Sequence, residues 1–554
     1  GALTGNVAGN LTGTVATATQ NSITTATGLV TVGAANTVSS IAGIPFYFGD
    51  SGSIYTHDVS GTDDTATSNT AFGINAMDAI TTGDNNVAVG NNALGANTTG
   101  GRQVAVGAVA LQDNSTGTRN TAVGYAALTD NTTGNYNVAL GDITLYTNTT
   151  GVANIAVGLG ALYANTTGSN NIAVGFESLD ANTTGVRNIA IGTSAYTASD
   201  TESNNIAIGY QAMATNSAGG ENNVVIGNGA GFAITSGDNN VALGFAALQT
   251  NNTGTQNVAI GVNSMLANTT GVNNVAVGAL SLDANTTGAD NIAIGVNALG
   301  SNTTGVDSVA IGDGAMALNT ASSNTAVGNS TLSSNVTGVY LAAFGAGALA
   351  KSVGDSNTGF GALAGSNITS GDHNTYVGFA SGDAHTTADD CTGVGSFALS
   401  ENTTGASNTA VGKHALFTNT TAALSTAVGY KSLEDNVGTS NTALGANSGL
   451  QNTTGAYNLA LGTDSLRDNT TGDFNTAIGR AALQSNTTAD SNIAIGRNAM
   501  YANTTGTRNL AIGATAYDAS DTENDNIAIG FGAMSENTAG GTLNIGIGNY
   551  ALDA

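Results

Sequence analysis

The sequence predicts an all-β protein built as a parallel β-solenoid of about 29 rungs, with one 17-residue repeat per rung. A Gly that follows a short apolar or β-branched run recurs 29 times from Gly73 to Gly548, at intervals of about 17 residues. No segment shows the 3.6-residue period of an amphipathic helix. The 554 residues include 78 Gly, 1 Pro and no Trp, and only 8% are charged. So few large apolar side chains favour thin, layered structure over several thick cores.

Each repeat begins with a strand signal. The copy from Asn291 to Gly305 reads Asn-Ile-Ala-Ile-Gly-x-x-Ala-Leu-x-x-Asn-Thr-Thr-Gly. Side chains alternate between the two faces of a strand, so Ile292 and Ile294 share one face and Ala293 points the other way. The small Ala face is expected to let another surface approach closely.

The rest of the repeat supplies a second apolar segment and a turn. Gly295 ends the strand, and Ala298 and Leu299 follow as a second short apolar element. The segment from Asn302 to Gly305 has turn chemistry, since Asn and Gly tolerate positive φ and Asn can bond its local backbone. One rung is therefore expected to hold two very short strands and two turns.

An Asn stands four residues before the marker Gly in all but five repeats, where it is replaced by Gln103, Ser308, Leu341, Cys391 and Ser425. Identical amides one rung apart can bond each other up a stack. We interpret this row as a structural amide ladder rather than as a row of ligand-binding amides, and Cys391 as a drifted ladder position.

The predicted column is long and thin. Rungs of a parallel sheet lie about 4.8 Å apart, so about 29 of them make a rod on the order of 140 Å long. A 17-residue rung encloses few side chains, and three columns packed along their Ala faces would bury more surface. We therefore expect a homotrimeric fibre.

Three regions are expected along the chain. Residues 1–45 are rich in Gly, Thr and Ala and read as an N-terminal shaft or joint segment. Residues 46–66 hold an aromatic cluster and read as a cap or transition, with docking of another fibre segment as the alternative. Residues 67–554 form the repeat solenoid. The chain stops partway through a rung, so further material or a partner is expected to cover that end.

Charge and residue usage narrow the class of protein. With 10 basic and 37 acidic residues the formal net charge is −27, which disfavours binding to nucleic acid and to anionic membranes. No apolar run approaches the ~20 residues that cross a bilayer, so no membrane insertion is expected. The single Cys391 rules out an intrachain disulfide framework.

No residue pattern points to catalysis, a cofactor or a metal. The four histidines, at 57, 373, 385 and 414, fall at unrelated rung positions and are interpreted as solvated surface residues. Asp84 and Asp238 follow turn glycines and could bind Ca²⁺, but solvated turn acids are the favoured interpretation. A solenoid enzyme that acts on polysaccharide would need paired carboxylates at fixed rung positions, whereas the acids here are scattered.

Two rows of exposed side chains raise further hypotheses. The Thr pairs of the turns suggest ice binding, although adjacent Thr residues usually face opposite ways and spoil a flat array. Tyr125, Tyr146, Tyr163 and Tyr210 could stack on sugars, or are single surface aromatics.

The repeat resembles a known type. Asn120-Thr-Ala-Val-Gly-Tyr-Ala-Ala-Leu128 followed by Asn131-Thr-Thr-Gly134 is similar to the repeats of phage tail fibres and of the YadA-like heads of trimeric autotransporter adhesins. The resemblance covers roughly residues 67–554. It implies a left-handed β-roll, homotrimers, attachment to cell surfaces and no enzymatic activity. The longer Asn-Thr-Thr-Gly turn, and the lack of a coiled-coil stalk or anchor in this sequence, favour the phage-fibre alternative.

The functional hypothesis is accordingly a structural attachment protein. The chain is expected to form a trimeric extracellular shaft, on a virion tail fibre, that supports adhesion to a host glycan or protein receptor and contacts other fibre or baseplate proteins. The alternative is a bacterial surface adhesin or a self-assembling extracellular filament whose subunits stack end to end.

Overall fold

The computed structural model describes residues 40–41, 44–45, 53–56, 65–216, 219–519, 521–536 and 541–553. Strands β1 (Ser40–Ile41) and β2 (Ile44–Pro45) form an antiparallel pair. Apart from this pair, the expected shaft segment 1–45 lies outside the described residues, as does most of the expected cap 46–66, including Phe46, Tyr47 and Phe48.

All other strands belong to one parallel sheet. It begins with β3 (Ile54–Tyr55) and continues in three-residue strands, one per repeat. These strands are β4 (Thr70–Phe72), β5 (Val87–Val89), β6 (Val104–Val106), β7 (Thr121–Val123), β8 (Val138–Leu140), β9 (Ile155–Val157), β10 (Ile172–Val174), β11 (Ile189–Ile191), β12 (Ile206–Ile208), β13 (Val224–Ile226), β14 (Val241–Leu243), β15 (Val258–Ile260), β16 (Val275–Val277), β17 (Ile292–Ile294), β18 (Val309–Ile311), β19 (Thr325–Val327), β20 (Ala342–Phe344), β21 (Thr358–Phe360), β22 (Thr375–Val377), β23 (Thr392–Val394), β24 (Thr409–Val411), β25 (Thr426–Val428), β26 (Thr442–Leu444), β27 (Leu459–Leu461), β28 (Thr476–Ile478), β29 (Ile493–Ile495), β30 (Leu510–Ile512), β31 (Ile527–Ile529) and β32 (Ile545–Ile547).

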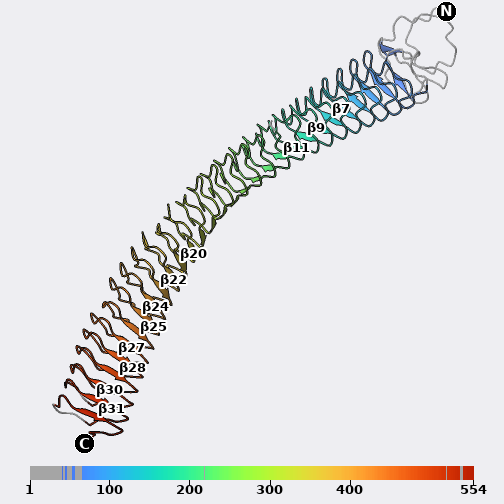
Figure 1. Cartoon of the computed structure of the whole chain (residues 1–554). Coiled ribbons are helices and arrows are strands. Elements are labelled where there is room, and N and C mark those ends of the chain that lie inside the picture. The colour runs from blue at the N-terminus through green and yellow to red at the C-terminus, as the bar shows by residue number, and fades with distance from the viewer. Residues whose placement is uncertain are drawn as a thin grey trace, which may run out of the picture.

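Each strand between β3 and β32 pairs with the equivalent strands of the repeat before it and of the repeat after it. In β9 and β10, for example, Ile155 pairs with Ile172 and Ala156 with Ala173, 17 residues on. This in-register ladder runs from β3 to β32 as a single curved column (Figure 1). The predicted parallel β-solenoid, with one repeat per turn, is confirmed. The described residues contain no helix, and hence none that could cross a membrane.

The expectation of two strands per rung is wrong. The Ala298–Leu299 segment is a run of turns, because Asn297 and Leu299 both have left-handed backbone conformations, with φ of 56° and 51°. It still stacks on its neighbours: the Leu299 N–H donates to the Ala315 carbonyl at 3.0 Å. Each rung therefore has one strand, and its other sides are stacked turns.

The core lies inside each single column. The central Ala of the strand is fully buried, as in Ala276 and Ala293, and it shares the interior with the buried Ala298 and Leu299 of the turn segment. The expectation that three columns pack along their Ala faces is therefore wrong, because those faces point into the chain's own rung. The outward face is formed by the first and third residues of each strand.

The predicted amide ladder is confirmed, although most of its bonds join side chain to backbone. Asn137 Oδ1 accepts the backbone N–H of Asn154, one rung on, at 3.0 Å. Asn154 Nδ2 donates to the Gly168 carbonyl at 2.9 Å and to Asn137 Oδ1 at 3.2 Å. Gln103 continues the ladder in place of Asn, since its Oε1 accepts the Asn120 N–H at 3.0 Å.

The turn Asn forms a second buried ladder that the sequence analysis did not identify. Asn148 Nδ2 donates to Asn131 Oδ1 at 2.8 Å and, as expected for a turn, to the nearby Gly151 carbonyl at 3.2 Å. Gly151 is not in a positive-φ conformation. Its lack of a side chain serves close packing instead: an added Cβ would lie 2.3 Å from both Asn148 Oδ1 and the Gly168 carbonyl oxygen.

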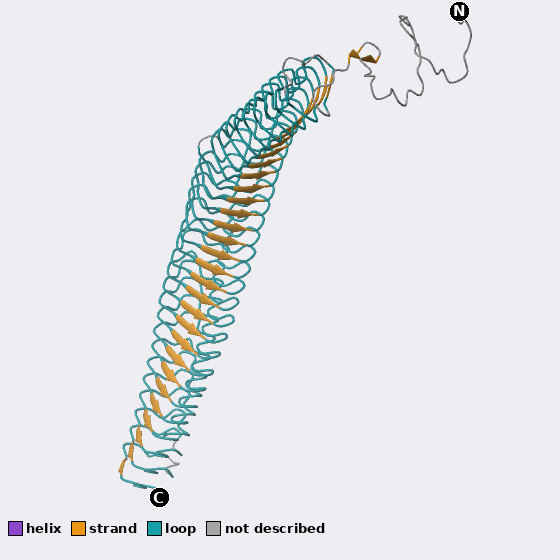
Figure 2. Cartoon of the chain, turned by 90° about the vertical axis from the view of Figure 1, so that its right-hand side faces the viewer, coloured by secondary structure: helices purple, strands orange, loops and turns teal. Residues whose placement is uncertain are grey.

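The sheet winds around the column. In Figure 2 the row of strands crosses from one edge near the N-terminal end to the opposite edge near the C-terminal end. The outward face of the sheet therefore follows a helical path along the surface.

Candidate functional surfaces

The most extensive candidate surface is the strand face, which we define as the first and third residues of β4–β32. Every one of these positions holds Val, Ile, Leu, Thr, Phe or Ala, and none holds a charged residue, in a chain of net charge −27. Many of the large side chains are exposed: Ile294 is 37% exposed and Phe360 55% exposed. Soluble monomers rarely expose apolar patches beyond a few hundred Å². The strand face therefore has the character of an interaction surface.

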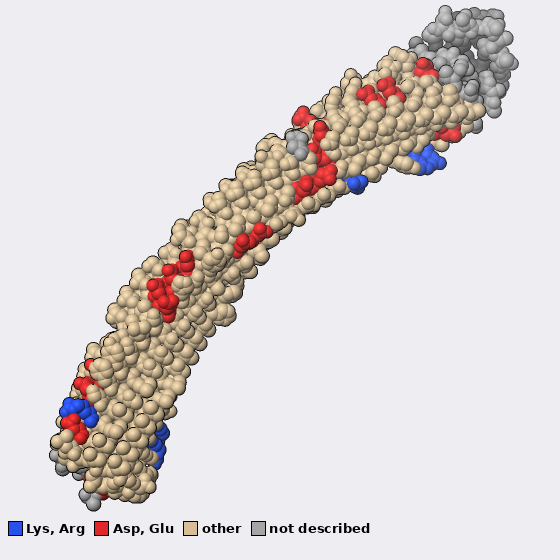
Figure 3. Space-filling model, in the orientation of Figure 1, with Lys and Arg blue, Asp and Glu red and all other residues tan. Residues whose placement is uncertain are grey.

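Charges lie elsewhere on the column. Figure 3 shows acidic side chains in separate patches along its length, with basic side chains in its N-terminal part and near its C-terminal end. Asp84 and Asp238, considered above as Ca²⁺ ligands, each use one carboxylate oxygen in the fold. Asp84 Oδ1 accepts the Thr67 N–H at 2.7 Å, and Asp238 Oδ1 accepts the Glu221 N–H at 2.7 Å. These two acids therefore hydrogen-bond one rung to the next. Among the described residues, no group of three or more His, Cys, Asp or Glu side chains could hold a metal ion.

The Thr pairs of the turns do face different ways. The first hydroxyl is bonded to the next rung, as Thr166 Oγ1 is to the Thr183 carbonyl at 3.1 Å. The second side chain, such as that of Thr167, is exposed. In pairs such as Thr166 and Thr167 only the second Thr is exposed, whereas both are exposed at Thr303–Thr304 and at Thr420–Thr421. The row of exposed Thr side chains is therefore uneven, which agrees with the objection to a flat ice-binding array.

One histidine departs from the expected surface placement. His385 is fully buried in the position of a ladder Asn, and its Nδ1 lies 2.6 Å from the hydroxyl of the buried Tyr376. Gly382 and Gly393 leave room for the Tyr376 ring, since a Cβ on either would lie within 2.8 Å of it. Burial lowers the pKa of His385 and raises that of Tyr376. The cluster is closed to solvent. Tyr376 stands where most strands have Ala and His385 where most turns have Asn, and together they fill the core of this rung.

The expectations for the other three histidines and for Cys391 have mixed outcomes. His373 is exposed, as expected, whereas His414 is partly buried and bonded to Glu434 Oε1 at 2.9 Å. Cys391 is fully buried in its ladder position, and burial raises the pKa of its thiol, which confirms its structural interpretation. His57 lies outside the described residues.

Aromatic side chains line several turns. Tyr125 and Tyr210 are exposed singly, at 59% and 51%. Tyr146 and Tyr163 stack on each other across neighbouring rungs, with ring centroids 5.4 Å apart. Such stacking occupies one face of each ring, so the pair contributes to rung stacking as well as to the surface.

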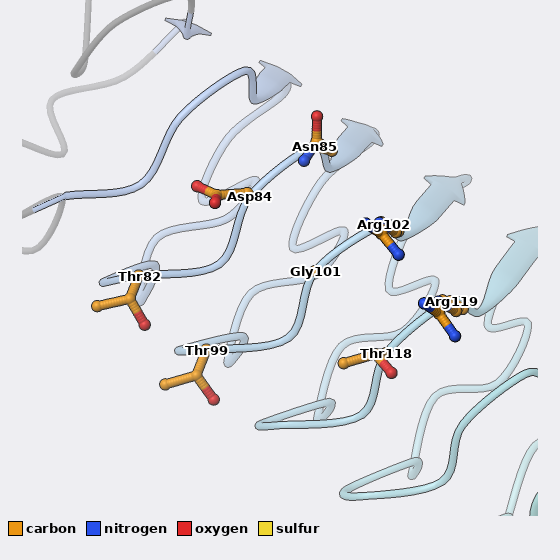
Figure 4. Close-up of a pocket in the computed structure, with 8 residues that line it drawn as sticks. All are labelled: Thr82, Asp84, Asn85, Thr99, Gly101, Arg102, Thr118 and Arg119. Atoms are coloured by element: carbon orange, nitrogen blue, oxygen red, sulfur yellow. The ribbon is translucent and has the colours of Figure 1, made fainter.

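A shallow hollow lies on the turn side of the first rungs. Its lining comprises Thr82, Asp84, Asn85, Thr99, Gly101, Arg102, Thr118 and Arg119, from three neighbouring rungs (Figure 4). Exposed Thr hydroxyls lie on one side and the two arginines on the other. Sequence analysis missed this site, although writing the sequence in rows of 17 places Arg102 directly beside Arg119.

No protein-family model matches the chain, and no match is found among curated proteins.

Proposed function

We propose that this chain is the shaft of an extracellular attachment fibre, in which three copies associate side by side along their strand faces. The fibre would hold apart its two ends, one joined to other fibre or baseplate proteins and the other near a host-surface receptor. A phage tail fibre is the favoured setting, and a bacterial surface adhesin or extracellular filament is the alternative.

The observation that best supports this proposal is the strand face, which is uncharged and continues along the whole strand ladder. A rigid rod needs continuous hydrogen bonding along its axis, which the in-register pairing from β3 to β32 provides. A polyanion repels its own copies except where they meet through uncharged surface. Because the repeat spacing is constant, only another column of the same kind matches the strand face rung for rung. The proposed threefold state comes from the resemblance of the repeat to trimeric fibres.

Assembly tests the proposal directly. Purified chain is expected to show about three times the 54.1 kDa monomer mass in analytical ultracentrifugation, and rods on the order of 140 Å long by electron microscopy. Ile294→Glu places a charge on the strand face and should shift the population toward monomer. Thr287→Glu, exposed on another side of the neighbouring rung, is the matched control and should leave assembly unchanged.

Two outcomes would count against the proposal: a wild-type monomer at micromolar concentration, or equal effects of both substitutions. Unlimited filaments in place of discrete trimers would favour the filament alternative. Gold-labelled antibody against the solenoid, applied to the source culture, separates virion fibres from bacterial surfaces, and labelling confined to the cell interior would reject both.

A further inference from the structure

One rung position that lines the hollow of Figure 4 has no side chain. The residue six positions before each marker Gly faces outward at this side of the column, and Gly101 is the only Gly among them. Its neighbours one rung away on either side are Asp84 and Thr118. Gly101 has no positive φ to explain it. Backbone alone therefore forms the surface here, and an added Cβ would lie 3.0 Å from the Asp84 carbonyl oxygen of the neighbouring rung.

The residue beside it breaks a pairing rule of the column. Arginine occurs at the next position of the repeat in four rungs, and in three of them the equivalent residue one rung on is its partner. Arg187 Nε donates to Asn204 Oδ1 at 2.7 Å, and Arg508 donates to both carboxylate oxygens of Asp525 at 2.7 and 2.9 Å.

The remaining two arginines are neighbours of each other. Arg119 donates to the Tyr136 hydroxyl and lies over its ring, with the guanidinium carbon 5.1 Å from the ring centroid. For Arg102, the residue one rung on is Arg119, which accepts no hydrogen bond. Its guanidinium has no hydrogen bond or ion pair with any residue that the structure describes. Two cations thus lie on adjacent rungs, beside Gly101.

We propose that this hollow binds a carboxylate-bearing saccharide, with the acid group between Arg102 and Arg119. A guanidinium pairs with a carboxylate through two parallel hydrogen bonds, and Arg119 is already held in place by Tyr136. The sugar ring lies over Gly101, where a side chain would exclude it.

The other lining groups suit sugar hydroxyls. Thr82 and Thr99 are exposed, and their hydroxyls make no hydrogen bond with described residues. Asp84 uses Oδ1 to accept from Thr67, at 2.7 Å from N and 3.0 Å from Oγ1, which leaves Oδ2 to accept from a ligand hydroxyl. The net charge of −27 opposes dense polyanions and so favours a sugar with isolated acid groups.

This inference rests on the proposed attachment role for its biological meaning, but it is tested separately from assembly. Titration calorimetry at low salt compares digalacturonic acid with its uncharged dimethyl ester and with sodium sulfate. The acid should bind the wild-type chain at least about tenfold more tightly than either, because a charged hydrogen-bonded pair is lost with the ester and the sugar contacts are lost with sulfate.

Three variants locate the site. Arg102→Gln removes the unpaired cation, and Gly101→Thr covers the bare backbone with the side chain found at position 118; each should weaken binding at least tenfold. Arg187→Gln is the matched control, at the same repeat position but without a hollow, and should bind as the wild type does. Circular dichroism and rod length by electron microscopy verify that each variant keeps its fold.

The inference is overturned if the wild type does not bind the acid, if ester or sulfate binds equally well, or if Arg187→Gln weakens binding as much as Arg102→Gln. None of these results depends on whether three copies associate, so failure here and failure of the fibre proposal are distinguishable.

Discussion

Replacing one Asn of the second ladder, which the turn Asn residues form, by Ala should lower the local stability of the column. Asn165 Nδ2 donates to Asn148 Oδ1 at 2.7 Å and to the Gly168 carbonyl at 3.0 Å, while Asn182 Nδ2 donates to Asn165 Oδ1 at 2.8 Å. These three Asn side chains and Gly168 are buried, so water does not replace the hydrogen bonds that are lost. At about 1 kcal/mol for each bond, Asn165→Ala costs about 3 kcal/mol of local stability.

Hydrogen exchange measured by mass spectrometry is the suitable assay, because rungs of a solenoid open through nearest-neighbour contacts rather than all at once. A loss of 3 kcal/mol corresponds to roughly a hundredfold faster exchange in peptides from residues 155–190, which form the rungs around Asn165. Peptides more than a few rungs away should be unchanged. Thr167→Ala, whose exposed side chain makes no such bonds, is the control and should change exchange less than threefold. An Asn165→Ala effect below tenfold, or one matched by the control, would refute the role assigned to the ladder.

Three other perturbations have defined outcomes. Gly244→Ala, at φ 142° with its Cβ 2.4 Å from the next rung, should lower local stability by at least about 2 kcal/mol in thermal melts, whereas Gly229→Asn, at φ 63° with 3.5 Å of clearance, should be neutral. Because burial lowers the pKa of His385 below its ordinary 6.5, the unfolded chain binds the proton first, so protection of that rung should be constant above about pH 7 and fall as the pH drops below about 6.5. His385→Asn should remove this dependence, and unchanged wild-type exchange between pH 7 and 5 contradicts it. Buried Cys391 should resist iodoacetamide at pH 8 and react fully in urea, by intact mass; rapid native labelling argues against its burial.

The solenoid was predictable from the sequence because one repeat forms one rung, although the number of strands per rung was wrong. The prediction that the Ala face packs against another column was wrong for a physical reason. Alternation separates Ala293 from Ile292 and Ile294, but both strand faces are apolar, so alternation alone does not say which is buried. Inside a 17-residue rung the strand shares the space with Ala298, Leu299 and the two buried ladder Asn side chains, which leaves room for the small Ala and not for two Ile side chains.

The turn chemistry was partly predictable. Asn and Gly suit turns for several reasons, and sequence alone does not separate positive φ from close packing. In the structure, left-handed conformations fall at Asn297 and Leu299, while Gly305 is needed for contact with its own Asn302 and with the rung above. The Arg102 site could have been found from the sequence by aligning repeats, since its anomaly lies in a neighbour 17 residues away.

The helical path of the strand face constrains any assembly that uses it. A second column that keeps contact from end to end must coil about the first, as the plies of a rope do. Tension along the axis draws the plies together, which is a useful property for a tether under load.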